Sequence, residues 1–112
     1  MKKIDYREVI RNLNAEKGGK NYQNGMEFEF RVLRKEKRNS LNVIRSAGSH
    51  SLIDIVSWKK NGQLWLISCK KNGIWTSAEL NALQEFKKHI PSNNIIKLAY
   101  YLTPKNWVMR TM

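Results

Sequence analysis

The sequence contains little cysteine, little acid and no long apolar run. A single cysteine among its 112 residues excludes an internal disulfide and a multi-cysteine zinc site. No apolar run approaches the roughly 20 residues of a membrane span, and residues 1–5 lack the apolar core of a signal peptide. We therefore expect one intracellular, cytoplasmic domain that does not enter a membrane.

Acidic residues are few beside basic ones. Nine Asp and Glu residues stand against 21 Lys and Arg residues, which gives a formal net charge of +12. Such an excess predicts a polyanionic partner, because phosphate contacts supply most non-specific nucleic-acid affinity. Charge alone does not separate a nucleic acid from an anionic membrane surface. The high asparagine and lysine content suggests an AT-rich genome, such as that of a virus or phage.

The N-terminal third is predicted to form helix, loop and helix. Residues 5–13 fit a short helix, and the polar, glycine-containing residues 15–25 predict a loop. Residues 26–38 show both strand-like and helix-like spacing of apolar residues, and their Glu and Lys content favours helix. We expect a single domain, with residues 1–24 as an N-terminal extension and loop and residues 25–112 as its core.

Short apolar segments predict five strands, at residues 41–45, 52–58, 63–70, 95–102 and 107–109. The second and third form a hairpin closed near Asn61 and Gly62. Between the third and fourth lies a helix for which Thr76 fits the N-cap and Glu79 the capping-box position. The order helix, three strands, helix, two strands predicts an α/β protein with a small mixed sheet flanked by helices.

Asp54 and Lys70 are predicted to lie close together at the open end of the hairpin. Asp54 lies inside an apolar segment, and Lys70 ends the partner strand. This arrangement suits a magnesium site, where a carboxylate binds the metal and a lysine orients water or neutralises phosphate. Ser68 shares a face with Lys70, whereas Cys69 points into the core and leaves its backbone carbonyl available as a metal ligand.

The ordered set of segments resembles the PD-(D/E)xK nuclease superfamily, and within it the archaeal-type Holliday junction resolvases. The resemblance rests on Gly25-Met26-Glu27-Phe28-Glu29, Arg45-Ser46-Ala47-Gly48-Ser49, Ile53-Asp54-Ile55-Val56 and Ile67-Ser68-Cys69-Lys70. Each motif alone is weak, and the serine-containing loop is the most specific. The resemblance implies a restriction-endonuclease-like core (αβββαββ). It also implies a homodimer that cuts two strands of a four-way DNA junction with Mg²⁺, for which Mn²⁺ can substitute.

The resemblance also implies a role for each matching residue. Glu29 corresponds to a helix glutamate that helps bind the metal or its water, with Glu27 as the alternative if the helix register differs. Ser49 corresponds to a loop serine near the scissile phosphate. Asp54 corresponds to the central metal-binding aspartate, and Lys70 to the catalytic lysine.

Ser68 departs from this pattern, because it stands where a second acid is expected. A hydroxyl is a poor metal ligand beside a carboxylate. We hypothesise that Glu79, in the first turn of the following helix, replaces the missing acid as a metal ligand. The alternatives are that Glu79 only completes the capping box with Thr76, and that Ser68 marks a site that has lost activity.

Several basic residues lie in or beside the elements that bear the predicted site, and we expect them to contact DNA phosphates. They are Lys20, Lys35, Arg38, Arg45, Lys59, Lys60 and Lys71. Trp75 and Tyr22 are the aromatic residues that we consider for nucleic-acid contact, although tryptophans more often pack in cores.

The leading expectation is therefore a dimeric, magnesium-dependent endonuclease acting on branched DNA. One alternative is a DNA-binding protein with the same fold and an inactive site. The other is a basic nucleic-acid-binding protein without nuclease ancestry, in which the Asp54–Lys70 pairing is accidental. Proximity of Asp54, Lys70 and Glu29 separates the first two from the third.

Overall fold

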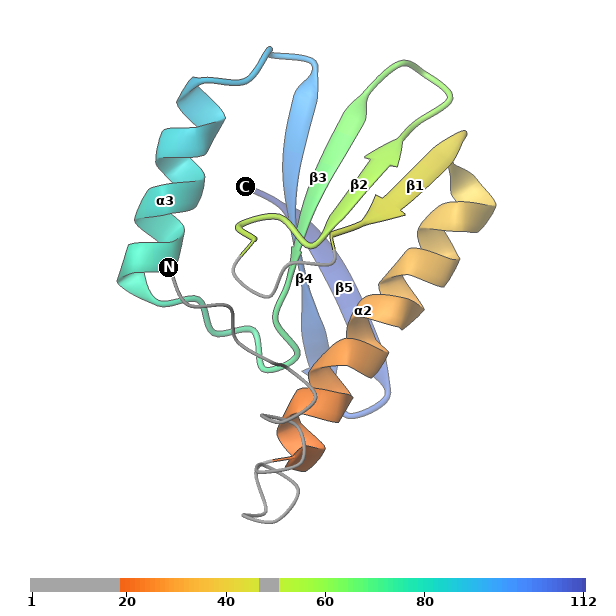
Figure 1. The fold of residues 1–112 in the computed structure, drawn as a ribbon, viewed down its shortest axis with the longest axis vertical. Helices are drawn as coiled ribbons and strands as arrows, with labels where there is room; N and C mark the ends of the chain where they lie inside the picture. The colour runs from red at the N-terminus through yellow and green to blue at the C-terminus, as the bar shows by residue number, and fades with distance from the viewer. Residues whose placement is uncertain (1–18, 47–50) are drawn as a thin grey trace, which may run out of the picture.

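A computed structural model describes residues 19–46 and 51–112, with side chains from residue 25 onward. A five-stranded sheet has a long helix on one side and a shorter helix on the other (Figure 1). In chain order the elements are α2 (Gly19–Asn39), β1 (Asn42–Arg45), β2 (Ile55–Trp58), β3 (Leu64–Cys69), α3 (Ser77–Lys88), β4 (Asn94–Thr103) and β5 (Asn106–Thr111).

The strands lie in the order β1-β2-β3-β4-β5, which is also their order in the chain. β3 and β4 run parallel and are joined through α3, whereas the other three neighbouring pairs are antiparallel. The predicted α/β class, the mixed sheet and the order of elements are therefore confirmed. No helix in the described ranges is long and apolar enough to cross a membrane.

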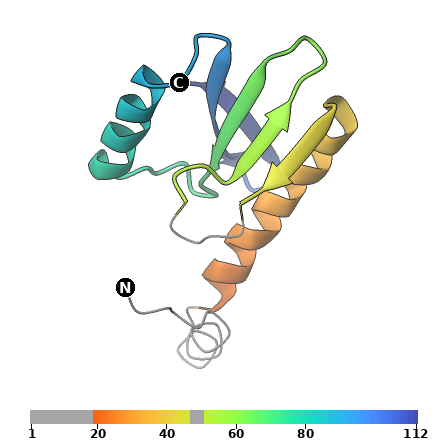
Figure 2. The same cartoon turned by 45° about the horizontal axis from the view of Figure 1, so that its top comes forward.

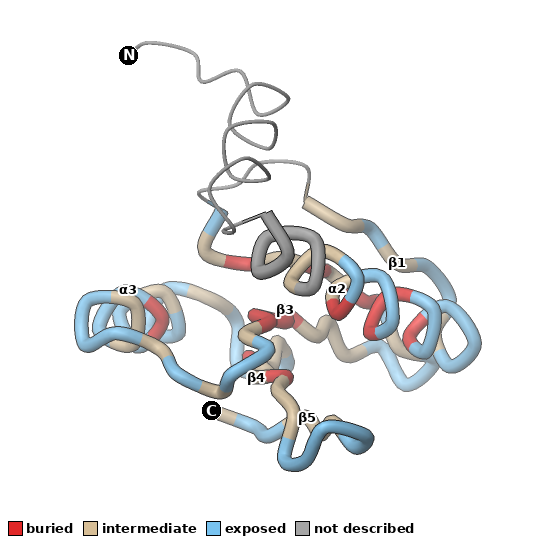
Figure 3. The backbone as a smooth tube through the Cα atoms, turned by 90° about the horizontal axis from the view of Figure 1, so that it is seen from below, coloured by how far each residue is buried: buried red, intermediate tan, exposed pale blue. Residues whose placement is uncertain are grey.

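The sheet divides the apolar core into two layers (Figure 3). Because side chains alternate along a strand, Ile67 and Cys69 of β3 face α2, while Leu66 faces α3. α2 buries Phe28, Val32 and Leu33 against its side of the sheet. α3 fully buries only Leu83, with Phe86 and Ile90 partly buried around it, so its contact with the sheet is narrower.

The predicted loop over residues 15–25 is wrong where the structure describes it, because α2 already begins at Gly19. Packing of Phe28 and Val32 fixes the following turns, and a helix once formed extends at low cost through unfavourable residues such as Gly25. The boundary expected after residue 24 therefore lies within a helix. The helix predicted at residues 5–13 lies outside the described residues.

The second strand is also shorter than predicted, since β2 begins at Ile55 and Asp54 lies just before it. Its ladder with β3 ends at the pair Ile55–Ile67, and the next available N–H, that of Cys69, bonds to the Asp54 carboxylate. The side chain thus takes the place of a backbone acceptor at the end of the ladder.

The hairpin turn forms where it was predicted. Lys59 and Gln63 close it through a backbone bond, and Gly62 has a φ of +89°, which favours glycine. The turn joins the end of β2 to the start of β3 (Figure 2), so it lies at the end of the hairpin away from Asp54, which precedes β2. Five residue steps of β3 separate Leu64 from Cys69, a distance of roughly 17 Å along the strand.

Candidate functional site

Asp54 lies at the open end of the hairpin, where β2 begins and β3 ends. Its Oδ2 accepts a hydrogen bond from the Cys69 backbone N–H at 2.7 Å. Its own backbone is fixed on both sides, because its N–H donates to Ile67 and its carbonyl accepts from Ser46. The carboxylate is therefore held in one place by the neighbouring strands.

Burial raises the pKa of Asp54 to about 6 from its ordinary 3.8. The Cys69 N–H and the charge of Lys70 act in the opposite direction, and the adjacent Glu29 carboxylate adds to the rise. Asp54 is thus a carboxyl group whose ionised form lacks sufficient compensating positive charge in the protein alone.

Glu29 reaches the site from α2 and is held there by Arg45 at the end of β1. Both Nε and Nη2 of Arg45 donate to Glu29 Oε2, at 3.1 and 2.9 Å. The guanidinium also lies 4.7 Å from the centre of the Phe30 ring. Arg45, which we expected to contact DNA, therefore positions a site carboxylate.

Lys70 follows β3 directly and pairs with Glu79 across a Nζ–Oε2 distance of 2.6 Å. The other oxygen of Glu79 accepts from the Thr76 backbone N–H, and Thr76 Oγ1 accepts from the Glu79 N–H, which completes the predicted capping box. The hydrogen bond from Lys70 is the main reason that the pKa of Glu79 lies below its ordinary value, and the cap adds to it. Glu79 thus faces the site and engages the lysine while it caps α3.

Ser68 is 4% exposed, and its hydroxyl accepts a hydrogen bond from the Trp75 indole N–H at 3.0 Å. Trp75 returns to the strand through a loop in which Gly73 has a φ of +71° and lies against Tyr100. The position where the resemblance expects an acid therefore anchors a tryptophan. Trp75, which we considered for nucleic-acid contact, closes one wall of the site.

Cys69 is buried in the core, as predicted, and it lies on the α2 side of the sheet. Burial, with the charges of Asp54 and Glu29, raises the pKa of its thiol far above the ordinary value. The thiol form is therefore favoured over the reactive thiolate.

One pocket of about 450 Å³ joins these groups. Its lining includes Glu29 of α2, Ser68 of β3 and Glu79 of α3, together with Asp54, which directly precedes β2, and Lys70, which directly follows β3. Ser51 and Leu52 also line it; their place just before Asp54 in the sequence is the only signal that could have found them. Ser49 lies outside the described residues.

The oxygen donors of the pocket suit a divalent cation in part. Asp54 and Glu29 are adjacent carboxylates, the ligand type that Mg²⁺ prefers, and the raised pKa of Asp54 shows that positive charge would be favourable there. Within residues 25–46 and 51–112, however, no three His, Cys, Asp or Glu side chains group as metal ligands. A cation would thus be held by Asp54, Glu29 and the Cys69 carbonyl, while Glu79 pairs with Lys70.

The expected DNA-contacting residues do not all lie near this pocket. Lys59 and Lys60 lie at the turn of the hairpin, the end away from Asp54 and Lys70, although they lie next to a strand that bears the site. Lys59 pairs with the buried Glu36 and covers the Trp65 ring at 3.9 Å, a contact that its sequence position does not reveal. Lys71 lies beside the site, Lys35 and Arg38 line a separate groove, and the side chain of Lys20 is not described.

Comparison with known proteins adds no family to this description. The sequence matches no protein-family model, and it has no significant match among curated proteins.

Proposed function

We propose that the protein is a magnesium-dependent endonuclease of the PD-(D/E)xK type, which resolves four-way DNA junctions as a homodimer. The observation that carries the proposal is the meeting of Asp54, Glu29 and Lys70 in one pocket, where Glu29 of α2 joins the two residues at the open end of the β2–β3 hairpin. The net charge of +12 supports a nucleic-acid substrate.

Each residue of the pocket would have a separate role in the reaction. Asp54 and Glu29 would hold Mg²⁺ with the Cys69 carbonyl; when bound, the ion supplies positive charge to the scissile phosphate and activates water. Lys70 would orient the attacking water or neutralise the phosphate, and Glu79 keeps its ammonium in place. By resemblance, Ser49 would contact the same phosphate.

Cleavage of a labelled four-way junction, with a matched duplex as control, tests this proposal in Mg²⁺ and in Mn²⁺. We expect paired symmetric cuts that fall at least about a hundredfold in Asp54→Ala and Lys70→Ala. Glu79→Gln should lose roughly tenfold, since it only positions Lys70. Glu85→Gln is the matched control, because Glu85 is an exposed glutamate of the same helix that pairs only with Lys88 and His89 among the described residues. Cutting that survives in Asp54→Ala contradicts the proposal.

A second candidate is a DNA-binding protein with this fold and no cleavage activity. Ser68 favours this second function, because its hydroxyl bonds to Trp75 at the position where the resemblance expects an acid. Two carboxylates therefore lie near the metal position, where the resemblance implies three. Tight junction binding without cutting in either metal would establish this second function. Sedimentation or light-scattering mass, which should give two copies per particle, tests the homodimer in either case.

A further inference from the structure

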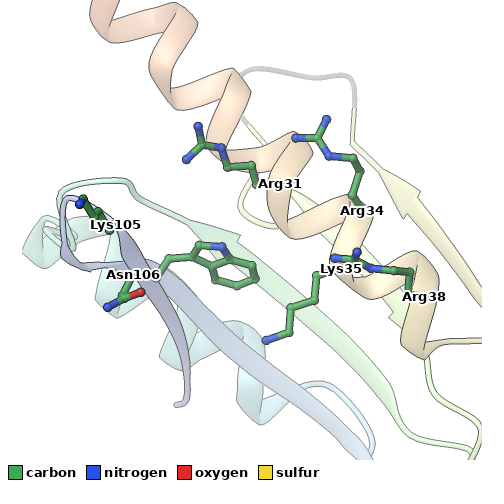
Figure 4. Close-up of a pocket in the computed structure, with 7 residues that line it drawn as sticks. Arg31, Arg34, Lys35, Arg38, Lys105 and Asn106 are labelled. Carbon is green, nitrogen blue, oxygen red and sulfur yellow. The ribbon is translucent and has the colours of Figure 1, made fainter.

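A groove of about 420 Å³ lies between α2 and the start of β5 (Figure 4), and none of the residues that line it lines the candidate site. Five basic side chains line it: Arg31, Arg34, Lys35, Arg38 and Lys105. Trp107 forms part of its wall and lies 4.8 Å from the Lys35 ammonium, measured to the ring centre. The Trp107 ring also meets the buried Phe28 edge-on, so it serves as a fixed wall that positions Lys35.

The lining of the groove has one sign of charge. It contains no acidic residue, and none of its five basic side chains pairs with an acid in residues 25–46 and 51–112. Cations gathered without counter-charges repel one another, and the same arrangement concentrates a field that attracts anions. The groove is therefore built for negative charge supplied from outside the described chain.

The four residues from α2 follow the helical repeat. Arg31, Arg34, Lys35 and Arg38 stand at positions i, i+3, i+4 and i+7, which places them on one face of the helix. The seven steps of helix from Arg31 to Arg38 span roughly 10 Å, and over that length of the duplex axis one DNA strand carries about three phosphates. The stripe thus fits successive phosphates of a polynucleotide better than one small anion.

A second pocket, of about 740 Å³, lies between the candidate site and this groove. Glu29, Cys69 and Lys70 line it and the candidate site alike, and Tyr101 to Pro104 form its other part. The Tyr101 hydroxyl accepts a hydrogen bond from Arg31 of the groove, while the Lys71 ammonium lies 6.0 Å from the Tyr101 ring centre. Pro104 precedes Lys105 directly. The two ends of this pocket therefore border the candidate site and the groove.

We propose that the groove binds the sugar–phosphate backbone of DNA several nucleotides away from the bond that the candidate site would cut, so that substrate runs from Lys70 past Tyr101 to Arg31 and Lys105. Assigning the bound DNA as substrate rests on the proposed function, whereas binding in the groove does not. Arg31, Arg34 and Lys105 are then backbone-positioning residues that read no sequence.

Binding without metal tests the groove independently of cleavage. Fluorescence anisotropy of a labelled DNA duplex in EDTA would compare wild type with Lys35→Gln/Lys105→Gln. The matched control is Lys37→Gln/Lys88→Gln, which removes the same charge from two exposed lysines outside the groove. We expect the groove variant to bind about tenfold more weakly at moderate salt. The slope of log Kd against log salt should fall by nearly two, at about 0.9 per lost phosphate contact.

A second pair, Arg34→Gln/Arg38→Gln, keeps the Lys35–Trp107 contact and should weaken binding to a similar extent. Equal losses in the groove and control variants would overturn the proposal, as would a salt slope that does not change. In a cleavage assay the groove variants should raise KM and leave kcat unchanged. If the groove substitutions leave DNA binding unchanged while wild type still cleaves, this inference alone is wrong. If they weaken DNA binding but wild type does not cleave, only the proposed nuclease activity is wrong.

Discussion

Asp54 is a largely buried carboxyl with another carboxyl beside it. Between about pH 4 and pH 6 the folded protein keeps a proton on Asp54 that the unfolded chain has released, because burial and Glu29 raise the pKa to about 6. Stability from this group therefore falls as the pH rises through that window. At neutral pH the ionised Asp54 therefore destabilises the protein, and a cation bound beside it would offset that cost.

We expect Asp54→Asn to stabilise the metal-free protein above about pH 6 and to have little effect near pH 4. Asparagine keeps an oxygen for the Cys69 N–H and removes the buried charge. A rise from 3.8 to about 6 corresponds to at most roughly 3 kcal/mol, so we expect a gain of about 1–3 kcal/mol. Urea unfolding in EDTA at both pH values measures it, with the exposed Glu27→Gln as control. A variant less stable than wild type at both pH values contradicts the argument. Mg²⁺ should stabilise wild type and not Asp54→Asn.

At the scale of elements, a buried ion pair joins α2 to the β2–β3 hairpin. Glu36 is 1% exposed and accepts from the ammonium of Lys59, which also covers the Trp65 ring. Charges removed from water are costly when separated, and such pairs are often replaceable by apolar residues. The pair therefore fixes how α2 lies on the hairpin more than it adds net stability.

Breaking this pair should cost more than removing it. We expect Glu36→Ala to destabilise the fold by about 3–5 kcal/mol, since it leaves the Lys59 charge without its partner, and Glu36→Met/Lys59→Met to lie within about 1 kcal/mol of wild type. Chemical unfolding of wild type, Glu36→Met, Lys59→Met and Glu36→Met/Lys59→Met in a double-mutant cycle measures the coupling. A double variant as unstable as Glu36→Ala would mean that packing around Glu36, and not its charge, holds the helix.

The sequence predicted those elements that depend on local chemistry. Thr76 and Glu79 mark the start of α3 because capping is a contact across three residues, and the alternation around Gly62 marks the hairpin. The approach of Asp54 and Lys70 followed from the same hairpin. Contacts between distant residues were not predictable: Lys59 seemed free for DNA because its partner lies 23 residues away. The early start of α2 was missed for the same reason, since packing outweighed the low helix preference of its glycines.

The helix α2 contributes to two separate surfaces, the candidate site and the basic groove, which the sequence alone did not distinguish. The face that carries Glu29 belongs to the candidate site, while the basic repeat from Arg31 to Arg38 belongs to the groove. The spacing of that repeat was visible in the sequence, but its meeting with Lys105 required the placement of the β4–β5 turn. Charge composition predicted a polyanion without giving its path across the surface.

For the whole molecule, the net charge of +12 should make stability and DNA binding respond to salt in opposite directions. Repulsion among the cations of the groove acts on the folded state and is screened as the Debye length falls to about 10 Å at 0.1 M salt. We expect the Tm of the DNA-free protein to rise by roughly 4 °C between low and moderate NaCl, about 1 kcal/mol, while its affinity for DNA falls steeply. Calorimetry and anisotropy on one salt series measure both.

The two double variants test where the repulsion lies. Lys35→Gln/Lys105→Gln should have a higher Tm at low salt than Lys37→Gln/Lys88→Gln, and its Tm should change less with added salt, because it removes repulsion where cations are most crowded. Equal salt responses of the two variants would mean that the groove does not concentrate the charge, and the path proposed for DNA would lose its electrostatic basis.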